Sequence, residues 1–288
     1  MMDEPMEIRG PWRWIRRIVI AGVTAAAFWS LLIMIFEERF IFFPAVYPDG
    51  LYEEQRSLNA EDHMFRTEDG LTLHGWFIKT DAPLATILMF HGNAGNLSHR
   101  GEILRRLRSA GFNIFIPDYR GYGKSEGSPT EEGVYRDGRA AAEYVRSLGG
   151  VDTSRILYFG SSLGGAVAVD AAIHRSPAGL ILESTFSSAR DVAAAVYPFL
   201  PVQFLLRSRF DSESKIGRLR CPLLFLHGTD DTIIPLKLGR KLFDAAPHPK
   251  EFHEIRGAGH NNVMIIAGPA FPELVRSFVE RLFGNAAP

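Results

Sequence analysis

The chain has 288 residues, of which 46% are hydrophobic and 23% are charged. This composition supplies enough apolar side chains for a sizeable core in one large domain, and it excludes disorder as the default state. The 32 lysines and arginines nearly balance the 33 aspartates and glutamates, so the charge gives no reason to expect nucleic acid as a partner. Cys221 is the only cysteine, which excludes an intramolecular disulfide.

An uncharged apolar run occupies residues 18–36. Its length is close to the roughly 20 helical residues that cross a hydrocarbon core. The run ends in large apolar residues before Glu37 and Glu38, whereas a signal peptide ends in small residues suited to cleavage. A buried core helix would carry polar residues along one face. We therefore expect residues 18–36 to form a transmembrane anchor.

Arginines crowd the N-terminal side of this run, at Arg9, Arg13, Arg16 and Arg17. Positive charge beside a membrane span favours the cytoplasmic side. We therefore expect a single-pass protein in which residues 1–17 form a short cytoplasmic tail. The domain at 37–288 is then expected on the other side of the membrane.

Strand-like and helix-like stretches alternate after the apolar run. The expected strands are Leu71–Ile78, Ala85–Phe90, Asn113–Ile116, Arg155–Phe159, Gly179–Leu182, Pro222–Leu226 and Glu251–Ile255. The expected helices are Ser98–Ser109, Thr130–Ser147, Leu163–Arg175 and Leu236–Ala246. This alternation predicts an α/β fold with a mostly parallel central sheet and helices on both faces. An antiparallel hairpin at 63–66 and 71–79 is expected to open the sheet.

The interval at about 184–220 breaks this alternation. It holds several weak helical patterns and an apolar segment at 197–206. We expect this interval to form a small helical lid over the sheet. No internal repeat or second domain of independent size interrupts residues 37–288.

Residues 160–164 read Gly-Ser-Ser-Leu-Gly, a G-x-S-x-G sequence between an expected strand and an expected helix. A serine at such a sharp turn projects its hydroxyl beyond the carboxyl edge of the sheet, and the two glycines let the strand and the helix pass closely. The neighbouring Ser161 would need a glycine where Phe159 stands. Ser162 is therefore the expected nucleophile.

A glycine-rich turn, His91-Gly-Asn-Ala-Gly-Asn96, directly follows an expected strand. A carbonyl attacked by a serine needs backbone N–H donors for the oxyanion that forms. We expect the first donor to be the N–H of Asn93, with Ala94 as the alternative. The second is expected to be the N–H of Leu163, directly after the nucleophile.

The base and the acid should follow the nucleophile along the chain. His260 lies in a glycine-flanked loop after the last expected strand, and its imidazole can take and return a proton near neutral pH. The acid, which would orient the imidazole and stabilise its cation, has three candidates. Asp231 and Asp230 lie in the turn after one strand, and Glu183 ends another.

In these motifs the chain resembles the α/β-hydrolase superfamily, and within it the single-pass membrane hydrolases of the serine-aminopeptidase-like branch. The similar segments are Phe42-Phe-Pro44, the glycine-rich turn, Asp118–Ser125, Leu182–Phe186 and His227–Asp231. The resemblance implies a triad of Ser162, Asp231 and His260, because the spacing of the family's His-Gly-x-x-Asp pattern favours Asp231 over Asp230. It also implies hydrolysis of carboxylic esters or acyl thioesters through an acyl-enzyme.

Two other functions stay open at this point. One is a serine peptidase or amidase of the same fold, although no sequence feature marks a pocket for a free N-terminus. The other is a catalytically inactive, membrane-bound binding scaffold. The histidine spacing predicts no metal site, and no glycine pattern predicts a nucleotide cofactor. We expect a small-molecule or lipid-like acyl substrate, and the sequence indicates no oligomeric state.

Overall fold

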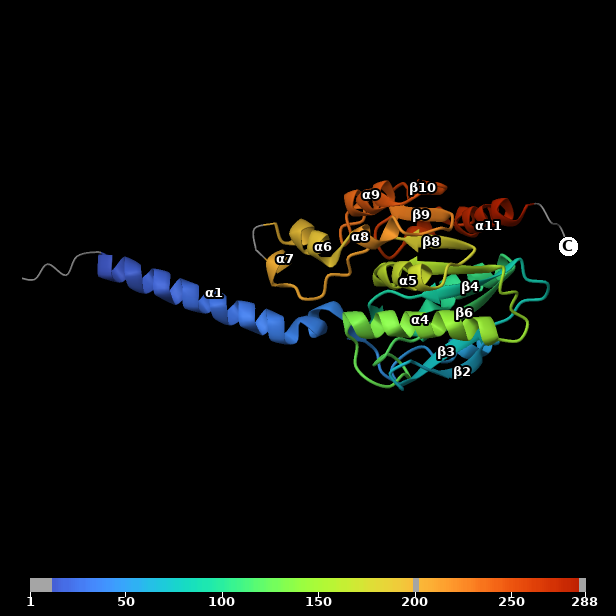
Figure 1. The fold of residues 1–288 in the computed structure, drawn as a ribbon, viewed down its shortest axis with the longest axis horizontal. Coiled ribbons are helices and arrows are strands. Elements are labelled where there is room, and N and C mark those ends of the chain that lie inside the picture. Colours follow the sequence, from blue (N-terminus) through green and yellow to red (C-terminus); the bar gives the residue numbers. More distant parts are fainter. Residues whose placement is uncertain (1–11, 199–201, 285–288) are drawn as a thin grey trace, which may run out of the picture.

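The computed structural model describes residues 12–198 and 202–284. Its centre is an eight-stranded sheet in the order β10-β9-β8-β7-β4-β6-β3-β2 (Figure 1). The strands are β2 (Glu61–Arg66), β3 (Thr72–Ile78), β4 (Ala85–Phe90), β6 (Phe112–Pro117), β7 (Ile156–Ser161), β8 (Gly179–Glu183), β9 (Leu223–Gly228) and β10 (Lys250–Ile255). Neighbouring strands from β6 to β10 are parallel, and β3 pairs antiparallel with β2 and β6. The predicted mostly parallel sheet and its opening hairpin are confirmed.

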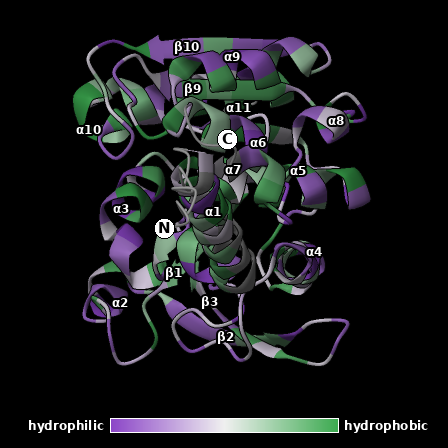
Figure 2. Ribbon diagram, turned by 90° about the vertical axis from the view of Figure 1, so that its left-hand side faces the viewer, coloured by the Kyte–Doolittle hydropathy of each residue, from purple (hydrophilic) through white to green (hydrophobic). Residues whose placement is uncertain are grey.

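Helices cover both faces of this sheet (Figure 2). One face packs against α4 (Glu131–Ser147), α5 (Leu163–His174) and α9 (Leu236–Ala245). The other packs against α2 (Glu54–Leu58), α3 (Gly101–Ser109), α10 (Val263–Ala267) and α11 (Ala270–Phe283). Every residue of β4 and β6 is buried as a result, because a sheet covered on both faces leaves no side chain in water. The predicted α/β architecture is therefore confirmed.

Local sequence explains where these helices begin and which face they bury. Helix α4 starts after Thr130, whose hydroxyl oxygen accepts a hydrogen bond from the N–H of Gly133, and acidic residues fill its first turn. In α3 the buried residues Ile103, Leu104 and Leu107 recur at helical spacing and face the sheet. The amphipathic patterns therefore fix both helices in the orientation that the sheet requires.

The lid between β8 and β9 contains α6 (Ala189–Val196), α7 (Val202–Leu205) and α8 (Glu213–Ile216). Residues 199–201 lie outside the described residues. Helix α7 contacts α1 (Trp12–Ile41), the long helix that leaves the rest of the structure in Figure 1. The lid therefore packs against the N-terminal helix as well as lying above the sheet.

The anchor expected at 18–36 is not borne out by the structure. Across 12–198 and 202–284, no helix combines the length and the apolar character needed to cross a membrane. Residues 1–11 of the expected tail lie outside the described residues. Helix α1 also continues past the expected end of the anchor, through Glu37, which is only 1% exposed. Its carboxylate accepts hydrogen bonds from the N–H groups of Arg207 (3.0 Å) and Ser208 (2.6 Å), so the end of α1 is fixed to the lid.

Two very short strands were not expected from the sequence. β1 (Phe43–Pro44) runs parallel to β5 (Ala94–Gly95), which lies within the glycine-rich turn. The turn then enters a short 3-10 helix, η1 (Leu97–Arg100), before α3. The segment that follows α1 therefore pairs directly with the glycine-rich turn.

We expect Gly164→Ala to lower the free energy of unfolding by about 1–3 kcal/mol. A Cβ at Gly164 would lie 2.1 Å from the carbonyl oxygen of Phe90, so the backbone of α5 or β4 must shift. Urea denaturation measures the change. Gly149→Ala is the matched control, because a Cβ there meets open space. Equal stability of the two variants would contradict the close approach of α5 to β4.

Candidate active site

Ser162 lies at the turn between β7 and α5. Its backbone has φ 54° and ψ −120°, a conformation that residues with side chains rarely adopt. The Ser162 N–H donates to the carbonyl oxygen of Glu183 (2.9 Å), and the Thr185 hydroxyl donates to the carbonyl oxygen of Ser162 (2.9 Å). Contacts from the end of β8 and the residues after it therefore hold the strained turn, which lies at the carboxyl end of β7.

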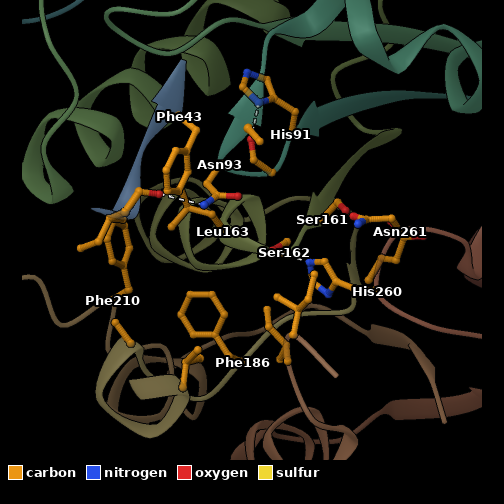
Figure 3. A pocket seen from close by; sticks show the side chains of 18 of the residues that line it. Phe43, His91, Asn93, Ser161, Ser162, Leu163, Phe186, Phe210, His260 and Asn261 are labelled. Atoms are coloured by element: carbon orange, nitrogen blue, oxygen red, sulfur yellow. Dashed lines mark hydrogen bonds between the residues drawn. The ribbon is translucent and has the colours of Figure 1, made fainter. Parts of the chain in front are cut away.

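His260 lies between Ser162 and Asp231. Its Nε2 is 3.0 Å from Ser162 Oγ, and its Nδ1 is 2.8 Å from Asp231 Oδ2. Because an ionised carboxylate only accepts hydrogen bonds, Nδ1 carries the proton and Nε2 is free to accept from the serine hydroxyl. Figure 3 shows Ser162 and His260 facing each other at the wall of a cavity. This is the geometry of a nucleophile, a base and an orienting acid.

The structure separates the three candidate acids. Asp231 is 6% exposed, and its carboxylate contacts His260. The side chain of Asp230 is exposed and accepts a hydrogen bond from its neighbour Thr229 instead. Glu183 is buried at the end of β8, where burial raises its pKa. Of the three, Asp231 is the acid that the fold brings to the imidazole.

The carboxylate of Asp231 is held from several directions. Its Oδ1 accepts the N–H groups of Ile233 (3.0 Å) and Ile234 (2.7 Å), and its Oδ2 lies 3.4 Å from Nε2 of His227. Burial by itself would raise the pKa of Asp231, but hydrogen bonds from His227, from His260 and from the Ile234 N–H hold this pKa below its usual value. Asp231 is therefore an anion at neutral pH and can stabilise an imidazolium.

The glycine-rich turn lies next to the nucleophile. A Cβ at Gly92 would be 3.5 Å from the Cβ of Ser162. Asn93 and Leu163 both line the cavity that contains Ser162. Leu163 is the first residue of α5, so its N–H has no acceptor within the helix. The position of both residues agrees with the expected oxyanion donors, whose role stays a prediction.

Residues from two other similar segments, and the end of α1, brace this turn. The carbonyl oxygen of Asn93 accepts hydrogen bonds from the Tyr122 hydroxyl (2.7 Å) and from the N–H of Phe43 (3.0 Å). The Asn93 side-chain amide donates to the carbonyl oxygen of Ile41 (2.8 Å). These bracing roles were not predicted from the sequence. The similarity at Phe42-Phe-Pro44 and at Asp118–Ser125, which contains Tyr122, was the available signal, and it did not indicate a contact.

Comparison with known proteins places the chain in a family. Residues 81–211 match the family described as Serine aminopeptidase, S33, in agreement with the branch expected from the motifs. The chain is 33% identical to the Alpha/beta hydrolase domain-containing protein WAV2 of Arabidopsis thaliana, over 92% of each chain. This chain belongs to the α/β-hydrolase superfamily.

A second relative and a solved structure are also similar to this chain. The hydrolase is 32% identical to protein bem46 of Schizosaccharomyces pombe, over 84% of this chain and 85% of that protein. An esterase from Pyrococcus furiosus shares its fold with a TM-score of 0.68 at 20% identity, over 85% of this chain and 98% of the esterase. At this identity the second likeness concerns the fold alone.

Ser162 and His260 open into a cavity of about 970 Å³. The end of α1, β1, the lid and α10 contribute apolar side chains to its wall, including Ile41, Phe43, Phe186, Leu206, Phe210 and Val263. Figure 3 shows Phe43 and Phe210 on the side of the cavity away from His260. Such a wall suits an apolar group next to the reacting bond. In the described part of the chain, no cluster of histidine, cysteine, aspartate or glutamate forms a metal site.

We expect Asp231→Asn to lower the stability of the hydrolase at pH 7, and this loss should shrink in acid. The folded-state pKa of Asp231 lies below the unfolded value of about 3.9, so its ionised form contributes stability above that pH. This contribution disappears as the pH falls through the folded-state pKa. Melting temperatures from pH 7 to pH 3 measure the difference between the variant and the natural protein.

The exposed Asp230→Asn is the matched control and should follow the natural protein at each pH. A gap between Asp231→Asn and the natural protein that stays constant down to pH 3 would contradict the assigned ionisation.

Proposed function

We propose that this α/β hydrolase is a serine hydrolase that cleaves carboxylic ester or acyl-thioester bonds through an acyl-enzyme. The observation that carries the proposal is the hydrogen-bonded chain from Ser162 through His260 to Asp231 at the wall of a large cavity. Membership of the superfamily supports it, because the three residues follow the superfamily's order along the chain.

Acylation begins when Ser162 Oγ attacks the carbonyl carbon of the substrate and His260 Nε2 takes the hydroxyl proton. The negative charge that develops on the carbonyl oxygen is stabilised by the N–H groups of Asn93 and Leu163. Asp231 stabilises the imidazolium through Nδ1. When the tetrahedral intermediate collapses, the alcohol or thiol leaves with the proton from His260, and the acyl group stays on Ser162.

Deacylation repeats these steps with water. His260 takes a proton from a water molecule, whose oxygen attacks the acyl carbon. The second tetrahedral intermediate uses the same two N–H donors. Its collapse breaks the bond to Ser162 Oγ, which receives the proton from His260, and a carboxylic acid leaves.

A lipid-like acyl group is the proposed substrate class, and the apolar wall supports it. Phe186 and Phe210 of the lid and Phe43 after α1 offer contact area for a hydrocarbon chain. A membrane location with a cytoplasmic N-terminus remains a prediction of the sequence alone, based on the arginines before the run at 18–36.

A fluorescent fluorophosphonate should label the natural protein and should not label Ser162→Ala, because the reagent reacts with an activated serine. Labelling is measured by in-gel fluorescence. Ser161→Ala is the matched control and should keep the label. Equal labelling of Ser162→Ala would place the nucleophile elsewhere, and a folded natural protein without label would favour the inactive scaffold.

The acyl-chain preference tests the proposed substrate class. On 4-nitrophenyl esters from acetate to octanoate, kcat/KM should rise with chain length, since burial of each CH₂ group contributes up to about 0.8 kcal/mol. The same panel includes an aminoacyl 4-nitroanilide as a peptidase substrate. No preference beyond acetate would exclude the lipid-like acyl group, and cleavage of the anilide alone would favour a peptidase.

A further inference from the structure

Arg100 contributes the only lysine or arginine to the cavity wall within residues 12–198 and 202–284. It is the last residue of η1 and directly precedes α3. Most of the surrounding wall is apolar, and Ser162 lines the same cavity. The positive charge of Arg100 therefore lies beside the expected nucleophile in a largely apolar cavity. The proposed ester hydrolysis uses no such charge.

The guanidinium of Arg100 is incompletely satisfied. Its Nη2 donates to the carbonyl oxygen of Ala94, but its Nε is buried and has no hydrogen-bond partner among the described residues. None of the ion pairs in the described part of the chain includes Arg100. Burial lowers the pKa of Arg100, yet a guanidinium stays protonated in proteins. The unpartnered N–H leaves the charge of this guanidinium incompletely compensated. An anion held in the cavity that Arg100 lines would compensate it.

The acidic groups on the same wall do not neutralise Arg100. Glu102 pairs with Nε of Arg106 at 2.8 Å. Glu37 accepts hydrogen bonds from the N–H groups of the lid. Glu183 lines the same wall but forms no ion pair with Arg100 in the described part of the chain. The buried Asp118 lies outside the cavity wall, and its Oδ1 accepts the N–H of Leu97 (2.7 Å). The cavity therefore keeps one positive charge available for a molecule that enters it.

We propose that Arg100 binds a carboxylate or phosphate group of the substrate, so that the hydrolase selects acyl esters that carry both an apolar chain and an oxyanion. A guanidinium presents several N–H donors in a planar arrangement that matches the oxygens of carboxylates and phosphates. This inference rests on the proposed ester hydrolysis and narrows its substrate class. The anionic group can belong to the acyl part or to the leaving group.

Two substrate pairs distinguish these sources. In the first, 4-nitrophenyl hexanoate is compared with mono-4-nitrophenyl adipate, whose acyl chain ends in a carboxylate. In the second, decanoylglycerol is compared with decanoylglycerol phosphate, whose leaving group is charged. The proteins are the natural chain, Arg100→Gln, Arg100→Lys and the control Arg66→Gln, which changes an exposed arginine of β2.

The natural protein should prefer the anionic member of at least one pair by about tenfold or more in kcat/KM, the effect expected for a hydrogen bond between charged groups. Arg100→Gln should lose this preference mainly through KM, while the neutral ester changes by less than about threefold. Arg100→Lys should keep part of the preference, because it retains the charge but not the planar donors. Arg66→Gln should match the natural protein.

Equal losses for the neutral and anionic esters in Arg100→Gln would overturn the inference, because they would mean that Arg100 only braces the Ala94 carbonyl. Lack of preference in both pairs by the natural protein would overturn it as well. Unchanged fluorophosphonate labelling of Arg100→Gln shows that Ser162 and the fold are intact.

Failure of the proposed function is distinguishable, since none of the four esters would then be hydrolysed. In that case, isothermal titration calorimetry measures the affinity of the natural protein and of Arg100→Gln for decanoylglycerol phosphate, and so tests the anion site directly. Binding that Arg100→Gln weakens at least tenfold supports the site, and equal or absent binding in both proteins overturns it.

Discussion

The backbone conformation of Ser162 is the constraint on which the rest of the site depends. A left-handed residue at the end of β7 turns the chain so sharply that α5 passes directly over the strand. A Cβ at Gly160 would then lie 2.5 Å from the carbonyl oxygen of Gly164, and one at Gly165 would lie 2.2 Å from the Thr185 hydroxyl. Any larger residue would force the backbone at Gly164 or the Thr185 side chain to shift. The sharp turn at Ser162 therefore favours glycine at both positions.

The site also depends on segments that are distant in sequence. The glycine-rich turn must keep its position next to Ser162, yet Gly92 and Gly95 allow the turn many conformations. Pairing of β1 with β5 and the Tyr122 hydroxyl restrict the turn, and Glu37 ties the end of α1 to the lid. The same end of α1 lines the cavity. Direct contacts therefore join the N-terminal helix to the lid and to the glycine-rich turn that holds the expected oxyanion donor Asn93.

Local pattern was enough to predict the strands of the main sheet, the helices α3, α4, α5 and α9, and the positions of Ser162 and His260. The helices α2, α10 and α11 were not predicted, and Asp231 was preferred to Asp230 and Glu183 only through the family resemblance. A buried strand and a strained serine turn each depend on a few consecutive residues. They can therefore be predicted from an apolar run and from a G-x-S-x-G sequence. Contacts between distant segments left no such signal. The pairing of β1 with β5, the burial of Glu37 and the lack of a partner for Arg100 Nε among the described residues each depend on where the chain returns in space. The apolar run at 18–36 predicted a membrane span that the described residues do not show.

The neighbours Asp230 and Asp231 show how backbone contacts decide which carboxylate reaches the imidazole of His260. Both residues follow β9, and only their direction differs. Asp231 faces inward because the N–H groups of Ile233 and Ile234 hold one oxygen, which leaves the other for His260. His227 in β9 contacts the Ile234 carbonyl oxygen with its Nε2 (2.9 Å), and the same Nε2 lies 3.4 Å from the second oxygen of Asp231. Helix α9 packs so closely that a Cβ at Gly239 would lie 2.4 Å from the His227 ring. The carboxylate therefore has little freedom to turn, and His260 Nε2 stays directed at the serine.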